Sequence, residues 1–329
     1  MKGKLDWRNA VVTAALPAGT DIRVLEFALE HPEGTPRFRF EPGSHTNIAL
    51  PLPGGSVTRS YSCLPAAPGR IRIGVKKHQK SRGGSDFLWT VQPGAKLRMT
   101  APENRFALSW RASAYLLVAG GVGITPLLGM AHALAGGPVP VTLAYAISSR
   151  DQIAFEDELR DLLGDRLTIH VSGEGERLDL AAAIAGLPAD GELYICGPVR
   201  MLNAAKALWA AAGRPQNRLR FEVFGEFGAA TEQPFTVRIA NCDEIVEVQP
   251  GQSMLDALSN AGVEMIWDCL RGECGLCKVD IVALDGKVDH RDVFFSEEQK
   301  AGNECLCTCV SRLTGGSVTI DTGYRPGPG

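Results

Sequence analysis

The sequence predicts a multi-domain fold in three parts: an antiparallel β-barrel, a doubly wound α/β domain with a parallel sheet, and a smaller α+β domain. The first observation is length, because 329 residues exceed the roughly 100–150 residues of one typical domain. The second is a change of period, from short alternating strands to strands that alternate with helices. The third is a cysteine-rich loop in the last third. We expect the domains at 1–110, 111–228 and 235–329.

The first third of the chain reads as short strands separated by Pro/Gly turns such as LPGGS and AAPG. Short strands at regular spacing favour an antiparallel barrel. The expected strands are 21–29, 45–52, 59–64, 70–77 and 95–101.

The middle third alternates apolar strands with helical stretches, which predicts a mostly parallel, doubly wound sheet. The pattern breaks before Pro234, which marks a linker. The rest predicts a mixed sheet with one helix at 253–262. In the middle third, strands are expected at 114–120, 139–148, 166–172 and 192–197, and helices at 125–136, 154–164, 178–186 and 201–213.

Composition excludes several classes of protein. A hydrophobic content of 45% with 22% charged residues is ordinary for a globular protein, and no apolar run reaches the roughly 18 residues of a membrane span. No basic, aromatic-interleaved stripe suggests nucleic acid. The opening residues MKGKLDWRNA are polar, so we expect no secretory signal and a cytoplasmic protein. The net charge is +9 over 1–112, −4 over 113–229 and −8 over 230–329. The acidic C-terminal third is suited to contact a positively charged electron acceptor or the basic N-terminal third of the same chain.

The run DCLRGECGLC contains Cys269, Cys274 and Cys277 in C-x4-C-x2-C spacing. This spacing is typical of a plant-type [2Fe–2S] cluster. Glycines between the cysteines let the backbone curl so that its N–H groups face the cluster sulfurs. Zinc and a disulfide are the alternatives; zinc sites favour paired short spacings, and disulfides favour secreted proteins. Three further cysteines, at 305, 307 and 309, could supply the fourth ligand.

Two runs have the chemistry of a flavin site: RSYS at 59–62, on an expected strand, and SRGGS at 81–85. An arginine fork suits phosphate, an aromatic ring suits a flat heterocycle, and a serine hydroxyl can bond a ring nitrogen. The glycine loop adds backbone N–H groups for the same phosphate. RSYS alone is a weak match, and it gains weight from the glycine loop and the cysteine run downstream.

The run GGVGITP at 120–126 follows an apolar strand and opens a helix, as expected of a pyrophosphate site. It departs from G-x-G-x-x-G, and a simple tight turn is the alternative. Cys196-Gly197-Pro198 follows another strand, where ligands bind in such folds, although a buried structural cysteine would look the same. The expected strand at 139–148 is followed by Ser149-Arg150-Asp151. Its arginine could bind a 2′-phosphate, but Asp151 adds negative charge and could accept hydrogen bonds from ribose hydroxyls. We therefore expect NADH rather than NADPH.

Taken in order, these motifs resemble the ferredoxin–NADP reductase superfamily and most closely the phthalate dioxygenase reductase family. The resemblance covers nearly the whole chain through RSYS, SRGGS, VAGGVGITPLL, CGP, FEVFG, CxxxxCGxC, DHRD and CVSR. It implies an FMN barrel, a nicotinamide domain and a C-terminal β-grasp ferredoxin domain.

The resemblance also implies residue roles. Arg59 and Ser85 would hold the flavin phosphate, Tyr61 would pack on the isoalloxazine, and Ser62 would approach its reactive nitrogen. Phe224 would cover the flavin where nicotinamide enters, with Thr125 and Cys196 beside the hydride path. The expected catalytic residues are Ser62, Thr125, Cys196 and Phe224; the expected cofactor contacts are Arg59, Ser60, Tyr61, Ser62, Val75, Lys76, Arg82, Gly83, Gly84, Ser85, Gly120, Gly121, Gly123, Thr125, Pro126, Ser149, Arg150, Cys196, Gly197, Pro198 and Phe224.

For the fourth cluster ligand, the match of CVSR to the family favours Cys309, whereas the usual ferredoxin interval counted from Cys277 favours Cys307. We expect Cys309, because loop insertions are tolerated more easily than changes in the segment that enters a strand. FMN is expected because no second motif in the barrel would hold the adenosine half of FAD.

The resemblance implies a monomeric reductase that passes electrons from NADH through FMN and the cluster to a terminal Rieske-type oxygenase acting on an aromatic or related small substrate. One alternative is an NAD(P)H-dependent FAD/[2Fe–2S] reductase for a cytochrome P450 or a diiron hydroxylase. Another is a redox sensor or electron carrier whose first two domains only bind nucleotide.

Overall fold

A computed structural model describes residues 6–30, 38–52, 55–78, 81, 83–224, 232–240 and 244–323. The chain divides into two compact units. One contains most of the N-terminal barrel and the whole middle α/β domain, and the other contains the C-terminal domain. Each unit is described by itself. No helix among the described residues has both the length and the apolar character that a membrane crossing requires.

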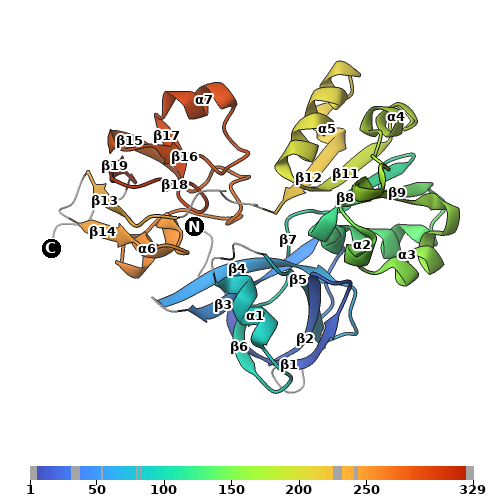
Figure 1. The fold of residues 1–329 in the computed structure, drawn as a ribbon, viewed down its shortest axis with the longest axis horizontal. Coiled ribbons are helices and arrows are strands. Elements are labelled where there is room, and N and C mark those ends of the chain that lie inside the picture. Colours follow the sequence, from blue (N-terminus) through green and yellow to red (C-terminus); the bar gives the residue numbers. More distant parts are fainter. Residues whose placement is uncertain are drawn as a thin grey trace. The chain divides into compact units, whose positions relative to one another are not determined.

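The first domain is the expected antiparallel barrel (Figure 1). Its strands run in the order β4-β5-β2-β1-β6-β3-β7, and an additional β3–β4 pairing closes the barrel. Its core contains Leu25, Phe27, Ile71 and Ile73, all with 0% exposure. The elements are β1 (Trp7–Pro17), β2 (Ile22–Leu29), β3 (Ser44–Leu52), β4 (Gly55–Leu64), β5 (Arg70–Lys76), α1 (Gly84–Thr90), β6 (Lys96–Thr100) and β7 (Glu103–Asn104).

Three barrel elements are absent from the sequence prediction: β1, α1 and the two-residue strand β7. In β1 the register with β2 shifts between Val12 and Ala14, and such a bulge interrupts the alternation by which a strand is found. The helix α1 begins at Gly84, directly after Gly83 in a left-handed conformation, so its start reads as a loop.

The second domain is the expected doubly wound parallel sheet, in the order β10-β9-β8-β11-β12. Helices α2 and α3 cover one face and α4 and α5 the other (Figure 1). Chain order reverses between β8 and β11, which are buried along their whole length. Ligands bind at such a switch point. The elements are β8 (Tyr115–Gly120), η1 (Gly121–Gly123), α2 (Ile124–Ala135), β9 (Val141–Ile147), η2 (Arg150–Gln152), α3 (Glu156–Leu163), η3 (Gly164–Arg166), β10 (Leu167–Val171), η4 (Ser172–Glu174), α4 (Leu180–Ala185), β11 (Glu192–Gly197), α5 (Val199–Ala211), η5 (Gln216–Arg218) and β12 (Leu219–Val223).

The C-terminal domain has a mixed sheet in the order β14-β13-β19-β15-β17, with β13 and β19 parallel. Helix α6 begins after Ser253, whose hydroxyl accepts from the backbone N–H of Asp256 at 3.0 Å. A second short helix, α7, buries none of its residues and so lacks the apolar period that predicts a helix. The elements are β13 (Phe235–Ile239), β14 (Ile245–Val248), α6 (Met254–Asn260), β15 (Lys278–Asp285), β16 (Val288–Asp289), α7 (Glu297–Gly302), β17 (Cys305–Cys307), β18 (Arg312–Leu313) and β19 (Ser317–Asp321).

Candidate functional site

Strand β4 carries the RSYS run along the barrel wall. The Ser60 hydroxyl donates to Asn47 Oδ1 at 2.6 Å, and the buried Ser62 hydroxyl donates to Glu222 Oε2 at 3.2 Å. The Arg59 side chain lies over the glycine loop, because a Cβ added to Gly84 would lie 3.4 Å from Arg59 Cγ. The structure therefore brings the expected phosphate arginine and the expected phosphate loop together.

The glycine loop is held by its own serines. Gly83 has φ 85°, a conformation that suits glycine, and its N–H donates to Ser81 Oγ at 3.0 Å. The Ser85 hydroxyl also donates to Ser81 Oγ, at 2.9 Å. Beside the loop, the carbonyl of buried Val75 accepts from the indole N–H of Trp89 at 3.0 Å. Arg82 lies outside the described residues.

The barrel contacts the nucleotide loop at Gly74 of β5. A Cβ at Gly74 would lie 2.7 Å from Thr125 Cγ2, so the Thr125 side chain packs directly on the Gly74 backbone and leaves no room for a side chain there. Thr125 is 2% exposed and its hydroxyl donates to the Val122 carbonyl at 2.9 Å. On the same side, Lys76 Nζ lies 3.6 Å from Asp21 Oδ2. The strand that follows RSYS therefore lies against the helix start that follows the glycines.

The GGVG turn is packed against the end of β11. A Cβ on Gly123 would lie 2.0 Å from the Cys196 carbonyl oxygen, and one on Gly120 would lie 2.7 Å from Pro198 Cδ. Gly197 approaches Gly120 in the same way, with its added Cβ 3.1 Å from Gly120 Cα. Because a side chain on Gly120 or Gly123 would collide there, the GGVG and CGP motifs pack directly against each other at the switch point. Gly121 in this turn has φ 56°, and Pro126 is buried in the first turn of α2.

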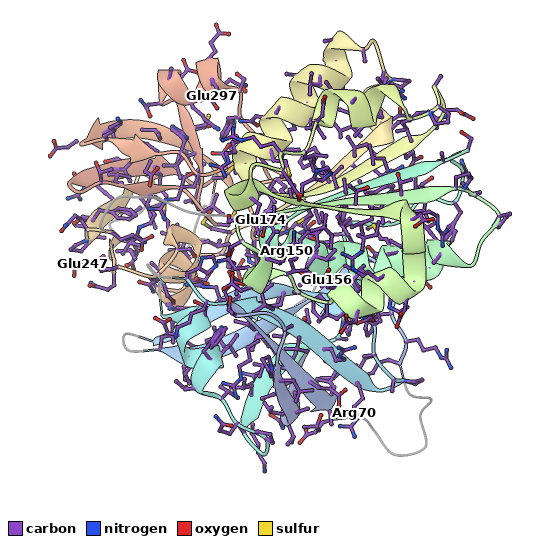
Figure 2. All side chains as sticks on the ribbon, turned by 45° about the vertical axis from the view of Figure 1, so that its right-hand side comes forward. Arg70, Arg150, Glu156, Glu174, Glu247 and Glu297 are labelled. Carbon is purple, nitrogen blue, oxygen red and sulfur yellow. The ribbon has the colours of Figure 1, made fainter. Side chains whose placement is uncertain are left out.

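At the end of the neighbouring strand β9, the guanidinium of Arg150 binds the carboxylate of Glu174 through two hydrogen bonds of 3.1 and 2.6 Å (Figure 2). Asp151 Oδ2 accepts from the Thr20 hydroxyl at 3.0 Å. Hydrogen bonds from Ser149 and Thr20 lower the pKa of Asp151. The Asp151 carboxylate is thus engaged by the barrel, and the acid that faces Arg150 is Glu174.

Sequence reasoning did not single out Glu222, although it lies within the FEVFG motif. Glu222 is 2% exposed on β12, one residue before Val223 and two before Phe224, which packs partly buried against the main core. A carboxylate in an apolar parallel strand needs a partner, because burying an unpaired charge is costly. An acidic residue in a strand that is expected to be buried could have drawn attention to Glu222. It does not show that Ser62 contacts it.

The cysteines of the C-terminal domain gather in one place. Cys269, Cys277 and Cys309 are 5, 2 and 8% exposed, Cys274 is partly exposed, and the Sγ atoms of Cys277 and Cys309 are 3.2 Å apart. Hydrogen bonds from Cys309 to Cys269, and from Cys307 and Cys309 to Cys277, lower the pKa of Cys269 and Cys277. Burial raises the pKa of Cys274, and the hydrogen bonds with Cys269 and Cys277 raise the pKa of Cys309. Cys269 and Cys277 are therefore the thiols of this group that ionise most easily.

The loop around these thiols has the conformation of a cluster loop. Leu270, Gly272 and Gly275 have φ values of 57, 72 and 71°. The backbone N–H groups of Arg271 and Glu273 both donate to Cys269 Sγ at 3.4 Å. Backbone donors aimed at sulfur stabilise thiolate ligands, so the residues present fit a [2Fe–2S] cluster.

The three candidate fourth ligands occupy different surroundings. Cys309 lies against both Cys269 and Cys277. Cys307 is fully buried beside Cys277. The Cys305 thiol donates to Asp280 Oδ1 at 3.2 Å. The contacts of Cys309 with two expected ligands favour it, and the full set stays a prediction.

A closed barrel with RSYS and a glycine loop, a nucleotide sheet with a glycine turn, and a mixed sheet with clustered thiols define a modular flavin and iron–sulfur oxidoreductase. Family models match each part: an oxidoreductase FAD-binding domain at residues 9–108, an oxidoreductase NAD-binding domain at 117–207 and a 2Fe-2S iron-sulfur cluster binding domain at 237–314. The last match favours the iron–sulfur interpretation over zinc or a disulfide.

Whole-chain similarity extends these matches. Phenoxybenzoate dioxygenase subunit beta of Ectopseudomonas oleovorans is 38% identical over 93% of this chain and 95% of its own length. The structure of phthalate dioxygenase reductase is 29% identical with a TM-score of 0.83, covering 96% of this chain and 98% of that one. Full-length CYP116B46 from Tepidiphilus thermophilus is 35% identical with a TM-score of 0.65, over 96% of this chain and 42% of that one.

The chain belongs to the phthalate dioxygenase reductase family of the ferredoxin–NADP reductase superfamily. It is an oxidoreductase with flavin-, NAD- and [2Fe–2S]-binding domains, and its relatives include reductase subunits of monooxygenase systems.

Proposed function

We propose that the chain is the monomeric reductase component of a Rieske-type oxygenase system. It takes electrons from NADH through FMN and a [2Fe–2S] cluster to a separate terminal oxygenase that acts on an aromatic or related small substrate. The observation that carries the proposal is the approach of Gly74 to Thr125, because it brings the flavin strands of the barrel to the start of the nucleotide helix within one compact unit.

The bound flavin and cluster supply the conversion of a two-electron donor into single electrons, which side chains lack. The side chains bind and orient. Arg59 and Ser85 are suited to hold a terminal phosphate, and the glycine turn at 120–123 leaves its backbone open to a pyrophosphate at a helix start. Phe224 would lie where nicotinamide enters, and the buried Thr125 and Cys196 would flank its ring.

Ser62 has a fixed proton. Its hydroxyl donates to Glu222, so its oxygen could accept from the reactive ring nitrogen only when that nitrogen carries a proton, as it does in the reduced flavin. Glu222 thereby orients the hydroxyl without itself needing to contact the flavin. Cys269, Cys274, Cys277 and Cys309 would hold the cluster.

FMN is the finer assignment within the flavin domain. The Arg59 side chain lies over Gly84, and Ser81, Gly83 and Ser85 form one hydrogen-bonded loop, which suits a terminal phosphate. No motif for an adenosine half is evident in the barrel sequence. These features support FMN.

A haem-type terminal partner is the second candidate, and the similarity to full-length CYP116B46 favours it. The similarity to phenoxybenzoate dioxygenase subunit beta and to phthalate dioxygenase reductase favours the first candidate, a Rieske-type terminal oxygenase. Steady-state turnover with a purified Rieske oxygenase and, separately, with a purified cytochrome P450 compares the two.

Electron exit through the C-terminal domain is tested by a chain that ends at residue 228. We expect this fragment to reduce ferricyanide with NADH at the rate of the full chain and to lose oxygenase turnover and cytochrome c reduction. Oxygenase turnover by the fragment would refute the route. If the full chain binds nucleotide but reduces neither ferricyanide nor cytochrome c, the protein is a nucleotide-binding module and not a reductase.

A further inference from the structure

We infer that Glu174, through its ion pair with Arg150, is the residue that excludes NADPH from the nicotinamide site. This inference rests on the proposed function and specifies which coenzyme its site accepts. A 2′-phosphate is the only chemical difference between the two coenzymes, so discrimination requires a residue at the adenosine ribose.

The pair lies where the adenosine ribose is expected. Arg150 begins η2, just after β9, and Glu174 ends η4, just after β10. In dinucleotide folds, the end of the strand beside the glycine turn carries the residue that reads the ribose 2′ position. Here β9 is the parallel neighbour of β8, which leads into that turn.

Two hydrogen bonds hold the two turns together. The N–H of Gly173 donates to the Ser148 carbonyl at 2.9 Å, and the Ser172 hydroxyl donates to the Ile147 carbonyl at 3.2 Å. A Cβ on Gly173 would lie 2.7 Å from the Ser148 oxygen, so this approach requires a residue without one. Glu174 is therefore presented to Arg150 by fixed backbone and not by chance contact of two long side chains.

The ion pair occupies the fork that a phosphate would use. Arg150 Nε and Nη2 bind the two Glu174 oxygens at 3.1 and 2.6 Å, the bidentate arrangement with which arginine also grips phosphate (Figure 2). A 2′-phosphate would have to displace the carboxylate and then remain beside its negative charge. A ribose hydroxyl meets neither obstacle, because it can donate to the carboxylate in place.

The other acid of the motif does not take this role. Asp151 accepts from Thr20 of the barrel, and its backbone carbonyl accepts from the Thr20 N–H at 3.0 Å. The side chains of Arg150 and Glu174 are 55 and 45% exposed, so both are open to a ligand. An exposed pair contributes little to stability, so its removal should change recognition and leave the fold intact.

The test is Glu174→Gln in the holoenzyme. We expect kcat/KM for NADPH to rise about tenfold through KM, a factor equal to roughly 1.4 kcal/mol, while kcat/KM for NADH stays within about twofold. Adenosine 2′-monophosphate, as an inhibitor competitive with NADH, should bind correspondingly tighter. Glu297→Gln is the matched control, because it removes an exposed carboxylate that pairs with Lys300 in the C-terminal domain.

In Glu174→Gln/Arg150→Ala the gain for NADPH should disappear, since the freed guanidinium is its source. The inference is overturned if Glu174→Gln leaves the ratio of kcat/KM for NADPH to kcat/KM for NADH unchanged, or lowers kcat/KM equally for both coenzymes. It is also overturned if the double variant retains the gain in kcat/KM for NADPH. A parent enzyme that already prefers NADPH would instead contradict the proposed coenzyme. The role of Glu174 would still be decided by the ratio of variant to parent and by binding of the 2′-monophosphate.

Discussion

The hydroxyl of Ser62 on β4 donates a 3.2 Å hydrogen bond to the buried carboxylate of Glu222 on β12, which lies 160 positions further along the chain. The bond joins the barrel to the nucleotide domain. We expect Glu222→Leu to slow flavin reduction by NADH about tenfold, because a misdirected contact at a reacting centre costs one to two orders of magnitude. Stopped-flow absorbance of the flavin band measures the rate.

Glu222→Gln keeps an amide oxygen that can accept from Ser62, so its rate should stay near that of the parent. Glu156→Gln serves as a surface control. Parent-like reduction in Glu222→Leu would show that the orientation of Ser62 has no part in the reaction.

The close approach of Gly74 to Thr125 gives a second prediction. Gly74→Ala places a methyl group 2.7 Å from Thr125 Cγ2, so either Thr125 rotates and loses its hydrogen bond to the Val122 carbonyl, or helix α2 or strand β5 shifts. Overpacking of this kind costs about 1–3 kcal/mol. We expect a raised KM for NADH and slower flavin reduction, measured by steady-state and stopped-flow kinetics.

Thr125→Ser removes the clashing methyl group, and the next atom of that side chain lies 3.9 Å away. The double variant Gly74→Ala/Thr125→Ser should therefore react faster than Gly74→Ala alone. Gly136→Ala, with open space around its added Cβ, is the matched control. An unimpaired Gly74→Ala, or a double variant no better than the single one, would count against this contact as the meeting point of the two sites.

The fourth cluster ligand gives a third prediction. Cys309→Ser should lose most iron and the visible absorbance of the cluster while it keeps the flavin bands, because ligation also stabilises the loop. Cys305→Ser and Cys307→Ser should keep both. Iron content and absorbance spectra decide the assignment.

Iron retained in Cys309→Ser with an altered electron paramagnetic resonance spectrum would indicate that the neighbouring Cys307 replaces the lost ligand. If Cys307→Ser loses the cluster and Cys309→Ser keeps an unchanged spectrum, Cys307 is the fourth ligand. The usual ferredoxin interval counted from Cys277 would then be the better guide.

The identity of the flavin is a fourth prediction. Flavin released by heat from the purified protein should co-migrate with FMN on chromatography, because one terminal phosphate saturates the loop around Gly83 and the fork of Arg59. Stoichiometric FAD would contradict the assignment and require an adenosine site in the barrel.

Much of the fold could be predicted because local period reports burial. The apolar runs ending at Gly120 and Gly197 are the buried central strands β8 and β11, and the family comparison confirms the three-part fold class. Strand β1 was missed because its bulge breaks the alternation, and α7 because it buries nothing. The predicted boundaries at 1–110, 111–228 and 235–329 stay predictions.

For the site, the sequence could identify residue types but not long-range pairs. Ser62 was singled out and Glu222 was not, since their contact depends on the packing of two domains. The sequence offers Arg150 as a cation for the ribose position, which stays a prediction, and it offers Asp151 as the adjacent acid. The pairing with Glu174 follows only from β9 and β10 lying side by side.

Anaerobic titration with NADH, followed by flavin absorbance and by electron paramagnetic resonance at low temperature, tests the central claim most directly. The claim is that one chain takes a hydride at its barrel and delivers single electrons to its cysteine loop. We expect bleaching of the flavin together with the signal of a reduced [2Fe–2S] cluster, and loss of that signal in Cys309→Ser. Full bleaching of the flavin in the parent protein with its cluster left oxidised would contradict the account.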